Sequence, residues 1–309
     1  MKPLFPERIR KNRKKIKRSA AALLCAAIMT GSLTGCAVQN PPGEDEGTQQ
    51  EPRIISTSVS ICDIMDRMQL DLVGVPDSSF RLPSRYDSVK RVGLPMSPDL
   101  EIVKSLKPTV IISPNSLQYD LKPQYESVGI ASIFMNLMSV EGMMKSIGQL
   151  GELYGRKNEA AQILADYENF MKQYNERIKG SEKPKVLLLM GLPGSYMVAT
   201  ENSYVGDLVK LAGGENVFAP DGNNAFLNLN TEAIVQTDPD IILRAAHGMP
   251  EEVKESFAKE FRENDIWKHF RAVQEGKVYD LDYNIFGMSA SLEYQKALTE
   301  LQDMLYGEG

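Results

Sequence analysis

The chain has 309 residues, of which 42% are hydrophobic and 25% charged, with a formal net charge of −6. This length is enough for one large domain or two lobes, each with its own core. The acidic balance argues against nucleic acid as a partner, since proteins that bind nucleic acid carry basic patches.

The first 35 residues have the parts of an export signal. Nine basic residues and one acid precede a short apolar run at about residues 19–30, an order typical of a secretory signal peptide rather than of a membrane span. The tetrapeptide Leu-Thr-Gly-Cys ending at Cys36 resembles the bacterial lipobox. We therefore expect cleavage before Cys36, a lipid anchor on it, and a chain held at the extracellular face of the cell membrane. An ordinary secretory signal with a chance cysteine is the alternative.

Cleavage changes both the charge and the cysteine count. Loss of residues 1–35 leaves 26 Lys and Arg against 40 Asp and Glu, a net charge of −14. Cys25 leaves with the signal and Cys36 carries lipid, so no intramolecular disulfide is expected. We expect the remaining Cys62 to be a small buried residue. Residues 36–52 are rich in Pro, Gly and acids and read as the lipidated N-terminus with a flexible tether.

From residue 53 onward, short apolar runs alternate with helical patterns. This alternation predicts an α/β fold with mainly parallel sheets. The expected strands are Arg53–Ser56, Asp71–Val75, Thr109–Ser113, Ala131–Met135, Lys185–Met190, Tyr196–Thr200, Asp240–Arg244 and Lys277–Leu281.

The middle of the chain differs from both halves. Residues 139–179 show apolar spacings of three and four with almost no strand signal, which predicts a long helical segment, bent or broken near Gly155. We therefore divide the exported chain into an N-terminal lobe (53–138), a connecting helix region (139–179) and a C-terminal lobe (180–309), with a cleft between the lobes.

A weak internal repeat supports two similar halves. Glu101 stands seven residues before Pro108, and Glu232 stands seven residues before Pro239; each proline opens an expected strand. Each glutamate would lie in the first turn of a short helix, where the helix dipole favours a carboxylate. From the residues alone, helix chemistry accounts for both glutamates.

Few side chains are available to hold a metal. The two histidines are His247, just beyond an expected strand, and His269, which reads as a surface or packed residue. Ligand sites in α/β sheets gather at such strand ends. Met96 lies in a Pro-Met-Ser-Pro loop, where a methionine does not pack as on a helix face. A haem needs only one or two axial ligands, and Met with His is a known pair. The residues alone leave open whether these two side chains hold a haem or are core and turn residues.

Two lobes bridged by a helix on an exported, lipid-anchored chain resemble the helical-backbone class of substrate-binding proteins of ABC importers. These proteins bind iron-siderophores, cobalamin or haem between the lobes. The resemblance implies that Glu101 and Glu232 dock onto arginines of the ABC permease. It also implies that hinge motion is small.

Short sequence segments along the whole exported domain give a more specific resemblance than the fold class does. The domain resembles the haem-binding lipoproteins of haem ABC importers in Gram-positive bacteria, which implies that Met96 and His247 hold the haem iron from opposite lobes. The resemblance also implies which groups bind the haem propionates. They are the backbone amides of Val59 and Ser60, the side chain of Ser78, and Arg81 as a charge partner. The matching segments are Pro83–Tyr86, Gly93–Pro98, Met190–Tyr196, Ser203–Asn216, Ile241–Pro250 and Asn264–Phe270.

These expectations define a function and its rivals. We expect a haem-binding carrier that delivers haem to the permease for iron acquisition, and no catalysis, because a six-coordinate iron has no open position for a reactant. The expected partners are haem, the ABC permease and an upstream cell-wall haem donor, with no nucleic acid and a monomeric state. A siderophore- or cobalamin-binding receptor of the same class is the alternative.

Overall fold

Two large β-sheets and a helical connection organise the described part of the computed structural model, residues 51–218, 222–228 and 231–307. The predicted signal peptide, Cys36 and nearly all of the tether lie outside these residues. Among the helices described, none is both long and apolar enough to cross a bilayer.

The first sheet has four parallel strands in the order β2-β1-β5-β6. Alternate residues along its central strands enter two separate cores: Ile54 and Ile112 face one, Ile55 and Ile111 face the other. Helices therefore cover both faces, as in other parallel sheets. We call this sheet with its helices the first lobe. Its elements are β1 (Ile54–Ser56), α1 (Val59–Arg67), β2 (Leu72–Gly74), α2 (Leu100–Ser105), β5 (Val110–Pro114), α3 (Gln118–Ser127) and β6 (Ser132–Met135).

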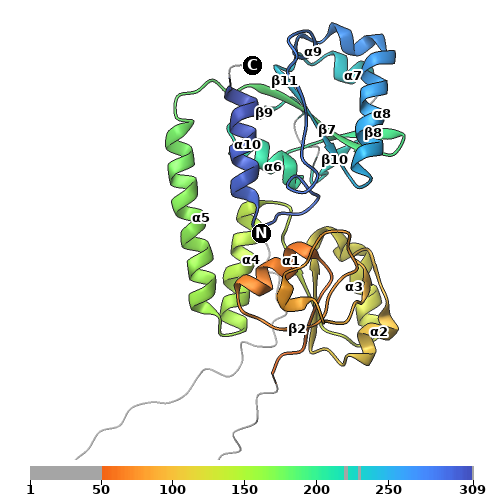
Figure 1. Ribbon diagram of the computed structural model, residues 1–309, viewed down its shortest axis with the longest axis vertical. Helices are drawn as coiled ribbons and strands as arrows, with labels where there is room; N and C mark the ends of the chain where they lie inside the picture. The colour runs from red at the N-terminus through yellow and green to blue at the C-terminus, as the bar shows by residue number, and fades with distance from the viewer. Residues whose placement is uncertain (1–50, 219–221, 229–230, 308–309) are drawn as a thin grey trace, which may run out of the picture. The chain divides into compact units, whose positions relative to one another are not determined.

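The second sheet has the order β10-β8-β7-β11-β12, with β9 added beside β7. Strand β8 runs antiparallel to its neighbours β7 and β10, and the other pairs are parallel. We call this sheet with its helices the second lobe (Figure 1). Its elements are β7 (Lys185–Leu192), β8 (Ser195–Ala199), α6 (Tyr204–Leu211), β9 (Glu215–Asn216), β10 (Phe226–Leu227), α7 (Thr231–Val235), β11 (Ile241–Ala246), α8 (Pro250–Glu263), η4 (Asp265–His269), α9 (Arg271–Gln274) and β12 (Val278–Asp280).

The connection is a helical hairpin whose long second helix leads into the second lobe. Helix α4 (Val140–Leu153) ends at a turn in which Gly155 has φ +67°, and α5 (Lys157–Arg177) then runs back along it. A Cβ on Gly151 would meet the Cβ of Ala160 at 2.5 Å, so small residues let the two helices approach closely. The C-terminal helix α10 (Tyr294–Tyr306) packs beside α5, where the Tyr174 hydroxyl donates a hydrogen bond to the Leu298 carbonyl at 2.9 Å (Figure 1).

The predicted fold class is confirmed: an α/β chain with mainly parallel sheets and a long helix between two lobes. All eight expected strands are present, and the break near Gly155 falls where the spacing placed it. The lobe boundaries at 138/139 and 179/180 stay predictions. The short elements that the sequence did not indicate are η2 (Ser84–Tyr86), β3 (Gly93–Leu94), β4 (Ser97–Pro98), η3 (Asn115–Leu117), β9 and β10.

Candidate ligand-binding site

Met96 stands at the tip of a tight hairpin in the first lobe. Strands β3 and β4 pair Gly93 with Pro98 and Leu94 with Ser97, which leaves Pro95 and Met96 as the two-residue turn. Gly93 has φ +95°, a conformation that L side chains rarely adopt, and a Cβ there would lie 3.0 Å from a backbone nitrogen. The hairpin presents Met96 to solvent with 66% of its surface exposed. Such exposure is unusual for a residue that normally fills cores.

His247 stands directly beyond β11 in the second lobe. Its N–H donates to the Gly191 carbonyl at 2.9 Å, which continues the β11–β7 pairing by one residue. The next two residues, Gly248 and Met249, have φ +85° and +43°, so the chain turns sharply into α8. The imidazole is exposed, and its position at the carboxyl edge of a parallel sheet is where ligands bind in α/β folds.

The start of α1 offers backbone donors. Val59 and Ser60 are its first two residues, and the Ser58 side chain makes no capping hydrogen bond. The first N–H groups of a helix lack an intrahelical acceptor and suit a carboxylate ligand.

The loop after β2 carries the other two expected residues, Ser78 and Arg81, both exposed. The Ser78 Oγ accepts a hydrogen bond from Phe80 N–H at 3.0 Å, which leaves its hydroxyl proton available to a ligand. Within the described residues, Arg81 forms no ion pair.

The same loop contacts the second lobe through an aromatic pair. The rings of Phe80 and Tyr283 stack with centroids 5.1 Å apart and an interplanar angle of 30°. The two residues come from loops that follow β2 and β12, so the contact joins the carboxyl edges of the two sheets. The sequence did not indicate this pair, because nothing local marks two aromatics so far apart in the chain as partners.

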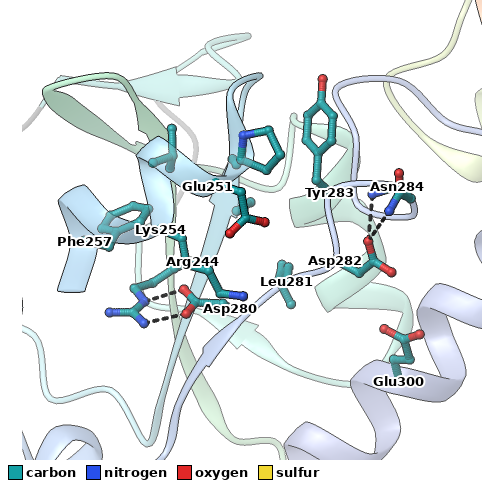
Figure 2. Close-up of a pocket in the computed structure, with 14 residues that line it drawn as sticks. Arg244, Glu251, Lys254, Phe257, Asp280, Leu281, Asp282, Tyr283, Asn284 and Glu300 are labelled. Carbon is teal, nitrogen blue, oxygen red and sulfur yellow. Dashed lines mark hydrogen bonds and ion pairs between the residues drawn. The ribbon is translucent and has the colours of Figure 1, made fainter. Parts of the chain in front are cut away.

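A cavity of about 360 Å³ lies at the ends of β11 and β12 (Figure 2). Ala246, Pro250 and Tyr283 line it together with an ion pair between Arg244 and Asp280. Both hydrogen bonds of that pair measure 2.8 Å. The cavity is therefore lined by the residues on either side of the His247–Met249 turn and by one ring of the aromatic contact between the lobes, but not by His247 itself.

Glu101 and Glu232 take matching positions in the two lobes. Each is exposed and lies in the first turn of a short helix, α2 or α7, that precedes a central strand. The N-cap of α2 is Asp99, whose Oδ1 accepts from the N–H groups of Glu101 and Ile102. Neither glutamate forms an ion pair within the described residues.

Other candidate groups fall outside the site. His269 is exposed at the end of η4, as expected, and Cys62 is fully buried, where desolvation raises the pKa of its thiol to about 12. Tyr196 packs against Phe257 and Trp267. Tyr204 is fully buried, and its burial raises the pKa of the phenol, which disfavours the tyrosinate form.

The described part of the structure contains no group of three His, Cys, Asp or Glu side chains placed to hold a metal ion. Three of the six large hydrophobic side chains that are exposed in this part of the chain lie on the two loops that carry Met96 and His247. Leu94 and Met96 belong to the hairpin of the first lobe, and His247 and Met249 to the turn before α8 in the second. Met249 was not expected, although it lies two residues from His247.

Comparison with known proteins gives consistent matches. A model of the family described as periplasmic binding protein matches residues 54–284. The high-affinity heme uptake system protein IsdE of Staphylococcus aureus strain Newman is 45% identical over 276 residues, which covers 89% of this chain and 93% of that protein. These relatives are substrate-binding transport proteins rather than enzymes.

Two solved structures match along their whole length. An ABC transporter substrate-binding protein from Listeria monocytogenes EGD-e has a TM-score of 0.80 and 49% identity, covering 84% of this chain and all of that one. The S. aureus IsdE structure complexed with heme has a TM-score of 0.79 and 44% identity, covering 83% of this chain and all of that one.

Proposed function

The chain belongs to the periplasmic binding protein family, and we propose that it binds haem outside the cell and delivers it to an ABC permease for iron acquisition. One observation carries this proposal. A thioether and an imidazole are exposed on the loops of opposite lobes, in a chain 45% identical to a protein named for high-affinity heme uptake.

Met96 and His247 supply the two axial ligands of the haem iron. Thioether and imidazole are an established axial pair. With both axial positions filled, the iron has no site for peroxide or dioxygen, which suits transport. Binding requires a neutral imidazole, so protonation of His247 in acid weakens it.

The propionates meet donors of the first lobe. The backbone N–H groups of Val59 and Ser60 donate hydrogen bonds to a carboxylate at the start of α1, where the helix dipole also favours negative charge. The Ser78 hydroxyl and the Arg81 guanidinium add a hydrogen bond and a charge. Arg81 forms no ion pair within the described residues, so pairing with a propionate disrupts no existing salt bridge.

Glu101 and Glu232 dock the carrier onto permease arginines. Their matching places in the two lobes present one carboxylate from each half of the molecule. Exposed charge pairs of this kind orient and accelerate docking more than they add affinity.

The carrier works as a lipid-anchored monomer. Cys36 holds it on the extracellular face of the membrane that contains the permease. It receives haem from a donor in the cell wall.

An absorption titration of the purified chain with ferric haem tests the proposal. We expect saturation at one haem per chain with a Soret band that changes in both Met96→Ala and His247→Ala. Met249→Ala and His269→Ala are matched controls, since each removes an exposed side chain of the same type. Unchanged spectra in both ligand variants contradict the assignment. A chain that ignores haem but binds a siderophore or cobalamin favours the alternative cargo.

A further inference from the structure

Two methionines differ from all others in the described part of the chain because their side chains are exposed. Thirteen of the 15 methionines fall within it, and eleven of these are buried or half-buried. The exposed pair is Met96, with 66% of its surface exposed, and Met249, with 54%. One belongs to each lobe, and both lie on the loops that present the proposed axial ligands.

Neither packing nor capping accounts for Met249. It occupies the N-cap position of α8 with φ +43° and makes no side-chain capping hydrogen bond. Ser, Thr, Asp or Asn would satisfy that position better, and a non-glycine residue in the left-handed region is strained. Backbone strain of this kind persists where the surrounding structure holds it, commonly at ligand sites.

An exposed thioether reacts with peroxides. The sulfur lone pair attacks one peroxide oxygen, the O–O bond breaks, and the other oxygen leaves as water after proton transfer. The sulfur loses two electrons and the peroxide gains them. The product, methionine sulfoxide, is polar and chiral, and reductases return it to the thioether.

We propose that Met96 and Met249 are the peroxide-sensitive sites of the empty carrier, and that oxidation of Met96 switches off haem capture. The inference rests on the proposed function, because the switch works by removing an iron ligand. Bound haem protects Met96, since coordination to iron draws electron density from the sulfur and the porphyrin covers it. Oxidation and haem loading therefore exclude one another at this residue.

The test treats the purified full chain with hydrogen peroxide, first empty and then after loading with ferric haem. Catalase removes the peroxide before haem is added to the empty sample. Peptide mass spectrometry then follows each methionine. In the empty chain, we expect Met96 and Met249 to gain oxygen before the half-buried Met138 and Met197, and we expect loading to slow the reaction at Met96.

Haem titration of the oxidised chain gives the second measurement. We expect haem binding at least about tenfold weaker, because losing even a residue that supports a metal ligand lowers metal affinity by about that factor. Treatment with methionine sulfoxide reductase should restore the affinity. The Met249→Leu chain should lose affinity on peroxide treatment as the unaltered chain does. The Met96→Leu chain should bind weakly before treatment and not respond to it.

The outcomes separate this inference from the function beneath it. Oxidation of Met96 no faster than that of Met138, or full haem affinity in a chain oxidised at Met96 while Met96→Leu binds weakly, overturns the switch alone. Full affinity and an unchanged spectrum in untreated Met96→Leu overturn the ligand assignment, and the switch with it.

Discussion

The Arg244 guanidinium is held on several sides at once. It donates two hydrogen bonds of 2.8 Å to Asp280, and it lies over the rings of Phe257 and Phe261 at 5.5 and 4.9 Å. Only 12% of its side chain is exposed. Removing one partner from a charge pair this enclosed destabilises a protein far more than removing one partner from a surface pair.

We predict that Arg244→Met destabilises the chain by about 2–3 kcal/mol, because Asp280 is left charged and half-buried without a partner. Urea unfolding measures the change. The double variant with Asp280→Leu should recover part of the loss, since it removes the orphaned charge. Lys254→Met, an exposed change in the same cavity wall, should stay within about 0.5 kcal/mol. A single variant that matches Lys254→Met contradicts the structural role of the pair.

Local chemistry marked some site residues in the sequence and could not mark others. Neighbouring residues alone place His247 after a strand and Met96 between two prolines. Both positions favour an exposed side chain, and both side chains are exposed. The Phe80–Tyr283 stack joins residues far apart in the chain, and only the folded arrangement of the loops brings them together.

Helix α4 begins on an element of the second lobe. The Asp207 Oδ2 in α6 accepts a hydrogen bond from the Val140 N–H at 2.8 Å, while the Ser139 Oγ accepts from Gly142 N–H. The Ala290 N–H also donates to the Leu137 carbonyl at 2.8 Å. These hydrogen bonds hold residues 137–140, which lead from the first lobe into α4, against the second lobe at both ends.

Burial raises the pKa of Asp207 from 3.8 to about 6, against the lowering effect of the Val140 hydrogen bond. The folded chain therefore binds the proton more tightly than the unfolded chain, so this group adds stability as pH falls from about 6 towards 4 and loses it as pH rises again. We predict that Asp207→Asn, which retains an acceptor oxygen, flattens the pH dependence of the unfolding free energy over this range. Unfolding at pH 4, 5, 6 and 7 measures it, with the exposed Asp120→Asn as control. An unaltered slope refutes the role of Asp207.

Among the helices and strands, those with long apolar patterns could be predicted from the sequence. Buried strands such as β5 and β7 are continuous apolar runs, and the 3.6-residue spacing of α4 and α5 is regular. Strands β3 and β4 have two residues each, too short for any period. Helix α2 begins only after its N-cap Asp99, because the preceding residues Ser97 and Pro98 pair as strand β4 of the hairpin.

Contacts between the two lobes lie at several places: buried residues of both belong to one hydrophobic cluster, and the Ala290 N–H donates to the Leu137 carbonyl. A helix of 21 residues, α5, spans the distance between them, and the Phe80–Tyr283 stack joins their loops on the ligand side. The stacked rings therefore fix how the loop after β2 meets the loop after β12.

We predict that a double-mutant cycle on Phe80→Ala and Tyr283→Ala gives a coupling free energy of about 0.5–1.5 kcal/mol, the range for a stacked aromatic pair. Chemical unfolding provides the four free energies. Both single variants should also release haem faster, because the edge of the site loses its cover. The pair Tyr119→Ala and Phe80→Ala, whose rings do not stack with each other, should be additive. Additive free energies in the Phe80–Tyr283 cycle would mean that these two rings do not couple the lobes energetically.

The most direct measurement is a crystal structure of the chain grown with ferric haem. We predict the iron bonded on one face to the Met96 sulfur and on the other to a ring nitrogen of His247, with the propionates directed at the start of α1. A porphyrin whose iron binds other side chains, or crystals that hold no porphyrin between these two loops, contradicts the account.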